Sequence, residues 1–135
     1  MHKLQINNYN VYRKDRLNQK GGGVLLYLHK SIKSTPCDEL NRWDYTDLVL
    51  CTIQLDAEIN ILVGTVYRSP SSDKINNEKL LRLFEDAQTV AGSTHSHIIV
   101  MGDFNLPEID YNSCTASASK DLFTLKFFNL TQNLI

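Results

Sequence analysis

The sequence predicts a single α/β domain in which strands and helices pack as a sandwich. Two strand-like segments joined by a four-residue turn come first, a segment with helical periodicity follows, and a short apolar strand then leads into a turn with an aspartate and an asparagine. This order of hairpin, helix and strand brings the ends of separate strands to one rim of a sheet. With 135 residues, 42% of them apolar, the chain has the size and composition of one domain.

The strands are predicted from short apolar runs. Residues 11–13 form a short candidate strand, and residues 24–28 form a stronger one after the flexible glycine turn at 21–23. Residues 48–55 and 60–67 are rich in β-branched side chains and should pair as an antiparallel hairpin. Both faces of the second hairpin strand are apolar, which predicts a central place in the sheet, and its glycine predicts a close approach or a bulge.

Two helices are predicted, and the first covers residues 76–91. Its apolar residues recur at helical spacing on one stripe, which should face the core: Leu80, Leu83, Phe84, Ala87 and Ala91. Asn76 is the expected N-cap, and Gly92 is the expected left-handed residue after the helix. The second helix should cover residues 121–133, with one apolar face made of Leu122, Leu125, Phe128 and Leu134.

Residues 97–107 carry the strongest functional signal, because an apolar strand leads directly into Gly102, Asp103, Phe104 and Asn105. Asp103 and Asn105 are two residues apart, so both side chains can lie on the same side of an extended segment. Asp103 can activate water or contact a divalent cation, and Asn105 can donate an amide hydrogen to a phosphate oxygen. The same residues also fit an Asx-turn, in which a side chain bonds only its own backbone.

The string Gly102-Asp103-Phe104-Asn105 resembles the aspartate-and-asparagine motif of the endonuclease/exonuclease/phosphatase superfamily, which includes the DNase I-like nucleases. Four further segments resemble, in order and spacing, the endonuclease domain of non-LTR retrotransposons: residues 9–16, 21–24, 66–70 and 106–111. The resemblance extends from about residue 6 to the C-terminus, with Tyr111 where those elements commonly carry tryptophan. It implies part of a DNase I-like four-layered α/β sandwich with mostly antiparallel sheets.

The resemblance also implies a site. Tyr67, Asp103 and Asn105 would surround the scissile phosphate of DNA: Tyr67 would donate a hydrogen bond to a phosphate oxygen, Asp103 would activate the attacking water, and Asn105 would hold water or phosphate in line. Arg68 would add a charge-assisted phosphate contact. Mg²⁺ is the implied cofactor, with Asp103 as a weak candidate ligand. The parent element would fuse this nuclease to a reverse transcriptase and act in the nucleus.

The family pattern has parts with no counterpart in residues 1–135. They are an N-terminal strand with an asparagine and the main metal-binding glutamate, and a C-terminal aspartate followed by an aspartate-histidine pair. We therefore expect a single partial domain that binds Mg²⁺ weakly or not at all, shows no nuclease activity alone, and keeps unpaired strand edges and an uncovered apolar face. The alternatives are a phosphatase of the same fold that acts on a smaller phosphoester, and a non-catalytic remnant or interaction module.

Charge gives little indication of a nucleic-acid partner. The formal net charge is −1, so no bulk positive field is present. Arg13, Lys14, Arg16 and Lys20 gather before the glycine turn, and a solvated loop is the favoured interpretation.

The remaining patterns point to an intracellular protein without a zinc site. Cys37, Cys51 and Cys114 are far apart, so no disulfide framework is expected; Cys51 should be a core residue and the other two loop thiols. No signal peptide or membrane-spanning run is evident. His95 and His97 could approach one metal ion, but no third ligand accompanies them.

Overall fold

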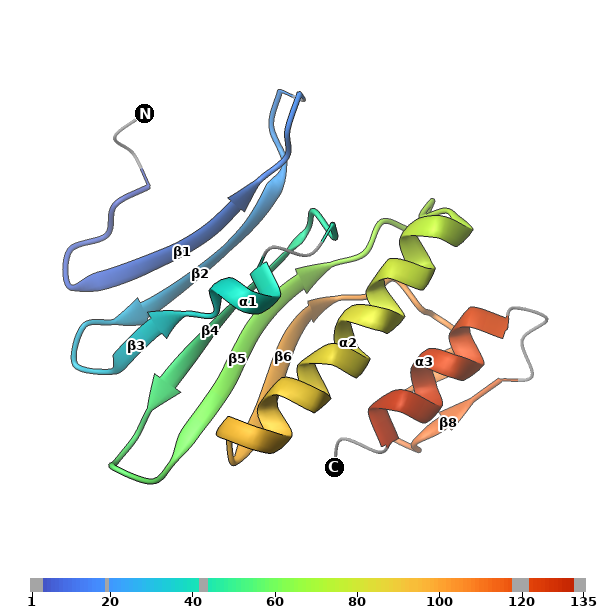
Figure 1. Cartoon of the computed structure of the whole chain (residues 1–135). Helices are drawn as coiled ribbons and strands as arrows, with labels where there is room; N and C mark the ends of the chain where they lie inside the picture. Colours follow the sequence, from blue (N-terminus) through green and yellow to red (C-terminus); the bar gives the residue numbers. More distant parts are fainter. Residues whose placement is uncertain (1–3, 19, 42–43, 118–121, 133–135) are drawn as a thin grey trace.

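The computed structural model describes residues 4–18, 20–41, 44–117 and 122–132, which form the predicted α/β arrangement of a sheet with helices (Figure 1). The elements follow in chain order: β1 (Tyr9–Asp15), β2 (Gly23–His29), β3 (Lys33–Pro36), α1 (Asp38–Asn41), β4 (Leu48–Gln54), β5 (Asn60–Tyr67), α2 (Lys74–Thr94), β6 (His97–Asp103), β7 (Ile109–Asp110), β8 (Thr115–Ala116) and α3 (Leu122–Gln132).

The main sheet has four strands in the order β3-β4-β5-β6. β4 and β5 form the predicted antiparallel hairpin, with Leu48 opposite Val66 and Gln54 opposite Asn60. β5 and β6 run parallel, and α2 is the connection that crosses from one to the other (Figure 1). The carboxyl ends of β5 and β6 therefore meet at one rim of the sheet.

β5 is central and buried on both faces, as its apolar pattern predicts. Leu62 and Val66 belong to the larger core, which includes the buried stripe of α2. Ile61 and Val63 pack in a smaller core on the opposite face, against residues of the β1–β2 hairpin. Gly64 confirms the expected close approach, because a Cβ at this position would lie 2.4 Å from the Leu50 side chain. The described residues thus form three layers, which are the hairpin, the sheet and the helices.

The predicted buried stripe of α2 is confirmed in full, but both predicted ends of the helix are wrong. The N-cap is Asp73, whose side chain accepts a hydrogen bond from the backbone N–H of Asn76. The helix also continues past Gly92 to Thr94 and ends where His95 becomes extended. Both differences follow from the strength of the local caps, because an ionised aspartate is a good N-cap and Gly92 is tolerated inside the helix.

The predicted apolar face of α3 is wrong for Leu122 and Leu125, whereas Phe128 is partly buried and packs against the larger core as predicted. The buried residues of the helix are Phe123, Thr124 and Phe127, whereas Leu122 and Leu125 are exposed, and Leu134 lies outside the described residues. This helix is apolar around most of its circumference, so periodicity alone does not select a face. Packing selects the face that carries Phe127, because its ring contacts the rings of Phe84 and Phe104.

The sequence interpretation missed the short elements β3, α1, β7 and β8, which carry little apolar periodicity. Cys51 is buried in β4 as expected, and Cys114 is exposed between β7 and β8. Cys37 also lies in a connecting segment, but it is buried in the larger core. All three thiols are free in the structure.

The outer face of β6 remains uncovered within the described part of the chain. The β1–β2 hairpin packs against β4 and β5, while Ile99 and Met101 on β6 are 46% and 53% exposed. β6 also lies at one edge of the four-stranded sheet. Both features match the expected open edge and apolar face. None of the helices described here is long and apolar enough to cross a membrane.

Candidate active site at the ends of β5 and β6

The rim of the sheet brings Tyr67 and Asp103 together. Tyr67 ends β5, Asp103 ends β6, and the two residues are partners in the parallel ladder. The N–H of Arg68 donates to the carbonyl oxygen of Asp103 at 2.8 Å, which extends the ladder by one bond. Paired residues of neighbouring strands project to the same face of a sheet, so both side chains lie on the face away from α2.

Gly102 allows this close pairing. A Cβ at residue 102 would lie 1.8 Å from the carbonyl oxygen of Val66 and 2.8 Å from its carbonyl carbon. No side chain fits at this position, because the neighbouring atoms belong to the backbone of β5. The glycine therefore fixes the distance at which Asp103 sits beside Tyr67.

Asp103 and Asn105 form the turn that follows β6. The N–H of Asn105 donates to Asp103 Oδ1 at 3.0 Å, which is an Asx-turn, and Asn105 has a left-handed φ of 50°. The Asn105 amide group Nδ2 donates to the carbonyl oxygen of Arg68 at 2.6 Å. Asp103 stays exposed, so its second carboxylate oxygen faces solvent while the first fixes the turn. The Asx-turn and an accessible carboxylate thus coexist at one residue.

Arg68 is buried, and its geometry favours a structural role over the expected phosphate contact. The residue is 5% exposed, and its Nε donates to Asn77 Oδ1 at 2.9 Å. Its Nη1 donates to the carbonyl oxygens of Phe104 and Asn105, each at 3.1 Å. The guanidinium also lies 4.8 Å from the centre of the Phe123 ring. Arg68 therefore ties the turn after β6 to α2 and α3.

Phe104 anchors the turn from within the core. Its ring centre lies 4.9 Å from that of Phe127 and 6.3 Å from that of Phe84. Because successive side chains of an extended segment point in opposite directions, Phe104 points inward and the two polar residues on either side of it stay at the rim. The motif therefore combines one close-packed glycine, one aromatic anchor and two polar side chains.

The backbone of Tyr67 is held from the other side by residues 45–47. Its N–H donates to the carbonyl oxygen of Asp47 at 2.8 Å, and the hydroxyl of Tyr45 donates to the carbonyl oxygen of Tyr67 at 3.0 Å. Tyr45 is 2% exposed, and burial raises its pKa to about 12. A neutral phenol at this position is a donor at any physiological pH.

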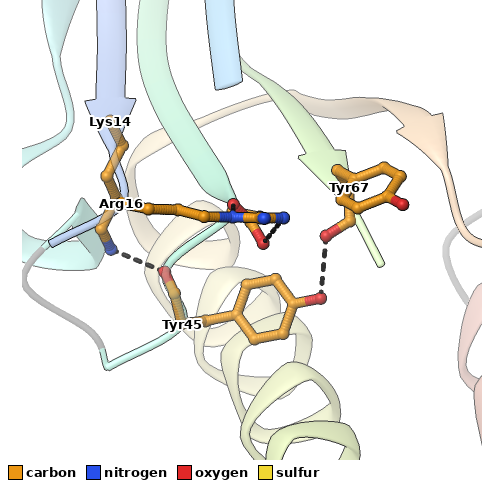
Figure 2. Close-up of polar contacts among 5 residues, drawn as sticks. Lys14, Arg16, Tyr45 and Tyr67 are labelled. Carbon is orange, nitrogen blue, oxygen red and sulfur yellow. Dashed lines mark hydrogen bonds and ion pairs between the residues drawn. The ribbon is translucent and has the colours of Figure 1, made fainter. Parts of the chain in front are cut away.

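Arg16 and Asp47 lie beside Tyr67, and the sequence interpretation named neither of them as a candidate site residue. Arg16 Nε and Nη2 each donate to one carboxylate oxygen of Asp47 at 2.8 Å, and the guanidinium carbon lies 5.8 Å from the centre of the Tyr67 ring (Figure 2). The hydrogen bonds that Arg16 donates to Asp47, together with the negative charge of Asp47, raise the pKa of Arg16. Both residues stand next to strand ends, and Arg16 also belongs to the basic cluster before the glycine turn, for which the sequence favours a solvated loop.

Lys14 also contradicts the expected solvated loop. Its ammonium donates to the carbonyl oxygen of Tyr45 at 2.6 Å (Figure 2). It also donates to the carbonyl oxygen of Asn41 at 3.5 Å. Burial lowers its pKa, against the opposing effect of Asp44 and Asp47. Arg13 is exposed as expected, but it lies within β1 and not in a loop, and it pairs with Asp15 on the same strand.

A cleft of about 600 Å³ opens beside Tyr67. Its lining includes Lys14, Arg16, Asn41, Tyr45, Asp47 and Tyr67. The cleft is thus bounded by the end of β1 on one side and by the end of β5 on the other.

The described residues do not form a complete metal site. They include no group of three or more histidine, cysteine, aspartate or glutamate side chains that could hold an ion. Asp103 offers a single carboxylate, whereas Mg²⁺ in phosphate-processing sites takes one or two carboxylates plus phosphate oxygens and water. His95 is occupied by hydroxyl groups, since its Nε2 lies 2.8 Å from Thr52 Oγ1 and its Nδ1 lies 2.8 Å from Thr94 Oγ1.

Comparisons with known proteins give one structural match. No model of a protein family matches the sequence, and no curated protein matches it either. Among solved structures, the chain is similar to the endonuclease domain of TRAS1, a telomere-specific non-LTR retrotransposon, with a TM-score of 0.66 and 14% identity. The match covers 96% of this chain and 54% of the other, so the chain spans about half the length of that domain. At this identity the similarity shows the fold, and residues 1–135 share the DNase I-like endonuclease fold that the sequence predicts.

Proposed function

We propose that residues 1–135 are part of a metal-dependent endonuclease domain that cleaves phosphodiester bonds in DNA, encoded by a non-LTR retrotransposon and fused there to a reverse transcriptase. The observation that carries the proposal is the rim, where Tyr67, Asp103 and Asn105 come together on a scaffold similar to the TRAS1 endonuclease domain. The place of action would be the nucleus, where the target DNA is found.

The chemistry assigned to each residue follows from its exposure and its fixed neighbours. Asp103 would accept a proton from the attacking water, because one carboxylate oxygen is engaged in the turn and the other is open. Asn105 would use its second amide hydrogen to hold a phosphate oxygen, since the first is bonded to the carbonyl of Arg68. Tyr67 would donate its hydroxyl hydrogen to the phosphate from the neighbouring strand.

Mg²⁺ is the proposed cofactor, and Asp103 would be one of its ligands. When bound, the ion would neutralise charge on the phosphate as it develops. Because the described residues lack the other protein ligands, we propose that residues 1–135 bind Mg²⁺ weakly and do not nick DNA alone.

The test is therefore a grafted enzyme, in which residues 1–135 are joined to the flanking segments of a structurally matched endonuclease domain. The assay follows Mg²⁺-dependent nicking of supercoiled plasmid. Asp103→Ala should lower the rate by about 10² to 10⁴, the usual contribution of a positioned general base. Asn105→Ala should cost about 10² by removing an electrostatic donor. Tyr67→Phe should cost less, because the ring still packs and a single hydroxyl is lost.

The control substitution is Asp110→Ala. Asp110 lies in β7 beyond the rim and accepts hydrogen bonds from Asn112 and Ser113 in its own turn, so it has the same charge and a similar local role without the rim position. Nicking should be nearly unchanged in this variant. If the grafted enzyme nicks DNA and Asp103→Ala lowers its nicking rate by less than threefold, the Asx-turn is the only role of the Asp103 carboxylate.

A further inference from the structure

We infer that Arg16, oriented by Asp47, is the arginine that contacts the phosphodiester backbone of the substrate beside Tyr67. The inference rests on the proposed function and adds a binding residue to it. It assigns to Arg16 the role that the sequence suggested for Arg68.

The two arginines differ in what their guanidinium groups can still bind. Arg68 is 5% exposed and uses Nε and Nη1 for three hydrogen bonds within the protein. The Arg16 side chain is 29% exposed and lines the open cleft. Its Nε and Nη2 bind Asp47, and within the described ranges its third nitrogen, Nη1, makes no hydrogen bond. Arg16 therefore presents two N–H donors to the cleft.

Asp47 makes this arginine a fixed donor. The two parallel hydrogen bonds of 2.8 Å hold the guanidinium in one plane, and the same residue binds the backbone N–H of Tyr67 through its carbonyl oxygen. Figure 2 shows the Arg16 side chain reaching from the end of its strand toward the Tyr67 ring. Arg16 and Tyr67 line the same cleft, and the guanidinium carbon lies 5.8 Å from the centre of the Tyr67 ring, so a phosphate bound in the cleft beside Tyr67 would lie within reach of Arg16.

The charges around the cleft limit the contribution of Arg16 to a single directional contact with the phosphate. The carboxylate of Asp47 balances the charge of Arg16, and Lys14 turns its ammonium toward backbone carbonyl oxygens. Asp44, which also lines the cleft, pairs with Lys79. No strong positive field results, so the contribution of Arg16 comes from its geometry. Arg–phosphate contacts of this type are directional because the guanidinium is planar.

DNA binding by residues 1–135 tests the inference without requiring catalysis. A fluorescently labelled 12-base-pair duplex is titrated in EDTA, and anisotropy gives the Kd over a series of salt concentrations. Each phosphate contact contributes about 0.9 to the slope of log K against log salt. Arg16→Gln should weaken binding about three- to tenfold at low salt and reduce the slope by about 0.9.

Two further variants separate a contact from a structural effect. Arg13→Gln is the matched control, since Arg13 is an exposed arginine on β1, the strand that ends just before Arg16, and does not line this cleft; its slope should equal that of the unmodified chain. Asp47→Asn removes the clamp but keeps the charge of Arg16, so the slope should fall by clearly less than the value of about 0.9 expected for Arg16→Gln. Circular dichroism and thermal melting show that each variant is folded.

The outcomes are distinct. An unchanged slope in Arg16→Gln, with normal binding by the unmodified chain, overturns the inference and leaves the proposed function intact. A loss of slope in Asp47→Asn as large as in Arg16→Gln also overturns it, because the pair would then act by holding the structure. If Arg16→Gln does not fold, Asp47→Asn and the charge-preserving Arg16→Lys decide: Arg16→Lys must keep the slope, and Asp47→Asn must lose no more than part of it. No salt-dependent binding by the unmodified chain would refute the inference and the proposed DNA substrate together.

Discussion

Replacing Gly102 with alanine is the most direct test of how the rim is built. The added methyl would lie 1.8 Å from the carbonyl oxygen of Val66, and contacts of a Cβ below 3.0 Å are essentially never observed. The two strands must therefore separate by about 1.2 Å to bring that contact to 3.0 Å. Such a movement breaks the 2.8 Å hydrogen bond from Arg68 N–H to the carbonyl oxygen of Asp103.

The expected loss of stability follows from these two effects. Overpacking a close contact costs about 1 to 3 kcal/mol, and a lost backbone hydrogen bond adds about 1 kcal/mol. The sum is about 2 to 4 kcal/mol, and a chain of this size loses roughly 3 to 6 °C in Tm per kcal/mol. Gly102→Ala should thus lower the Tm of residues 1–135 by about 6 to 24 °C.

Gly92→Ala is the matched control, because it adds the same methyl group to the same chain. No atom lies within 4 Å of a Cβ at residue 92, which is inside α2. Alanine there should raise stability by about 0.5 to 1 kcal/mol, since glycine is the poorer helix former. Thermal melting and urea unfolding followed by circular dichroism measure both variants. If Gly102→Ala melted within about 2 °C of the unmodified chain, the close approach of β6 to β5 would not be the constraint described here.

Three further outcomes are expected. Lysine at Ile99 or Met101 should reduce self-association in size-exclusion chromatography and change stability by less than about 0.5 kcal/mol, because both side chains are exposed. Val100→Lys, on the buried side of β6, should instead unfold the chain. Equal self-association in all variants would show that the exposed apolar face of β6 does not drive self-association. Below pH 10 the phenol of Tyr45 is protonated in the folded and unfolded chain, and between pH 10 and about 12 only the unfolded chain loses its proton. Stability should therefore fall by about 1.4 kcal/mol per pH unit in that window and show a weaker fall in Tyr45→Phe, as measured by urea unfolding at pH 9 and 11. Submillimolar Mg²⁺ should change the Tm of residues 1–135 by less than about 1 °C; a rise of several degrees would reveal a complete ion site.

Local patterns determined the part of the fold that depends on neighbours in sequence. The stripe of α2 was predictable because helical spacing places five apolar residues on one face, whatever they later contact. The β4–β5 hairpin was predictable because a short turn leaves adjacent strands only one simple pairing. The meeting of Tyr67 and Asp103 followed from the same order of elements, since parallel strands joined by a helix align their carboxyl ends.

Other features depend on partners that no local pattern specifies. The buried face of α3 was misassigned because its apolar residues surround most of the helix, and only packing against Phe84 and Phe104 selects Phe127. The helix ends were misassigned because Asp73 and Asn76 are both good caps, and the choice between them is a competition of small energies.

The candidate site also has parts that the sequence determined and parts that only the tertiary structure decided. The sequence by itself determined the Gly-Asp-Phe-Asn turn and the strand that positions it, because these residues interact within a few positions of each other. Only the tertiary structure decided which arginine is accessible. Arg68 is buried by contacts with residues up to 55 positions away, as with Phe123, and Arg16 is oriented by Asp47, 31 residues further along the chain. The sequence specifies the charge of a side chain, but the exposure of that side chain depends on which distant segments of the chain pack against it.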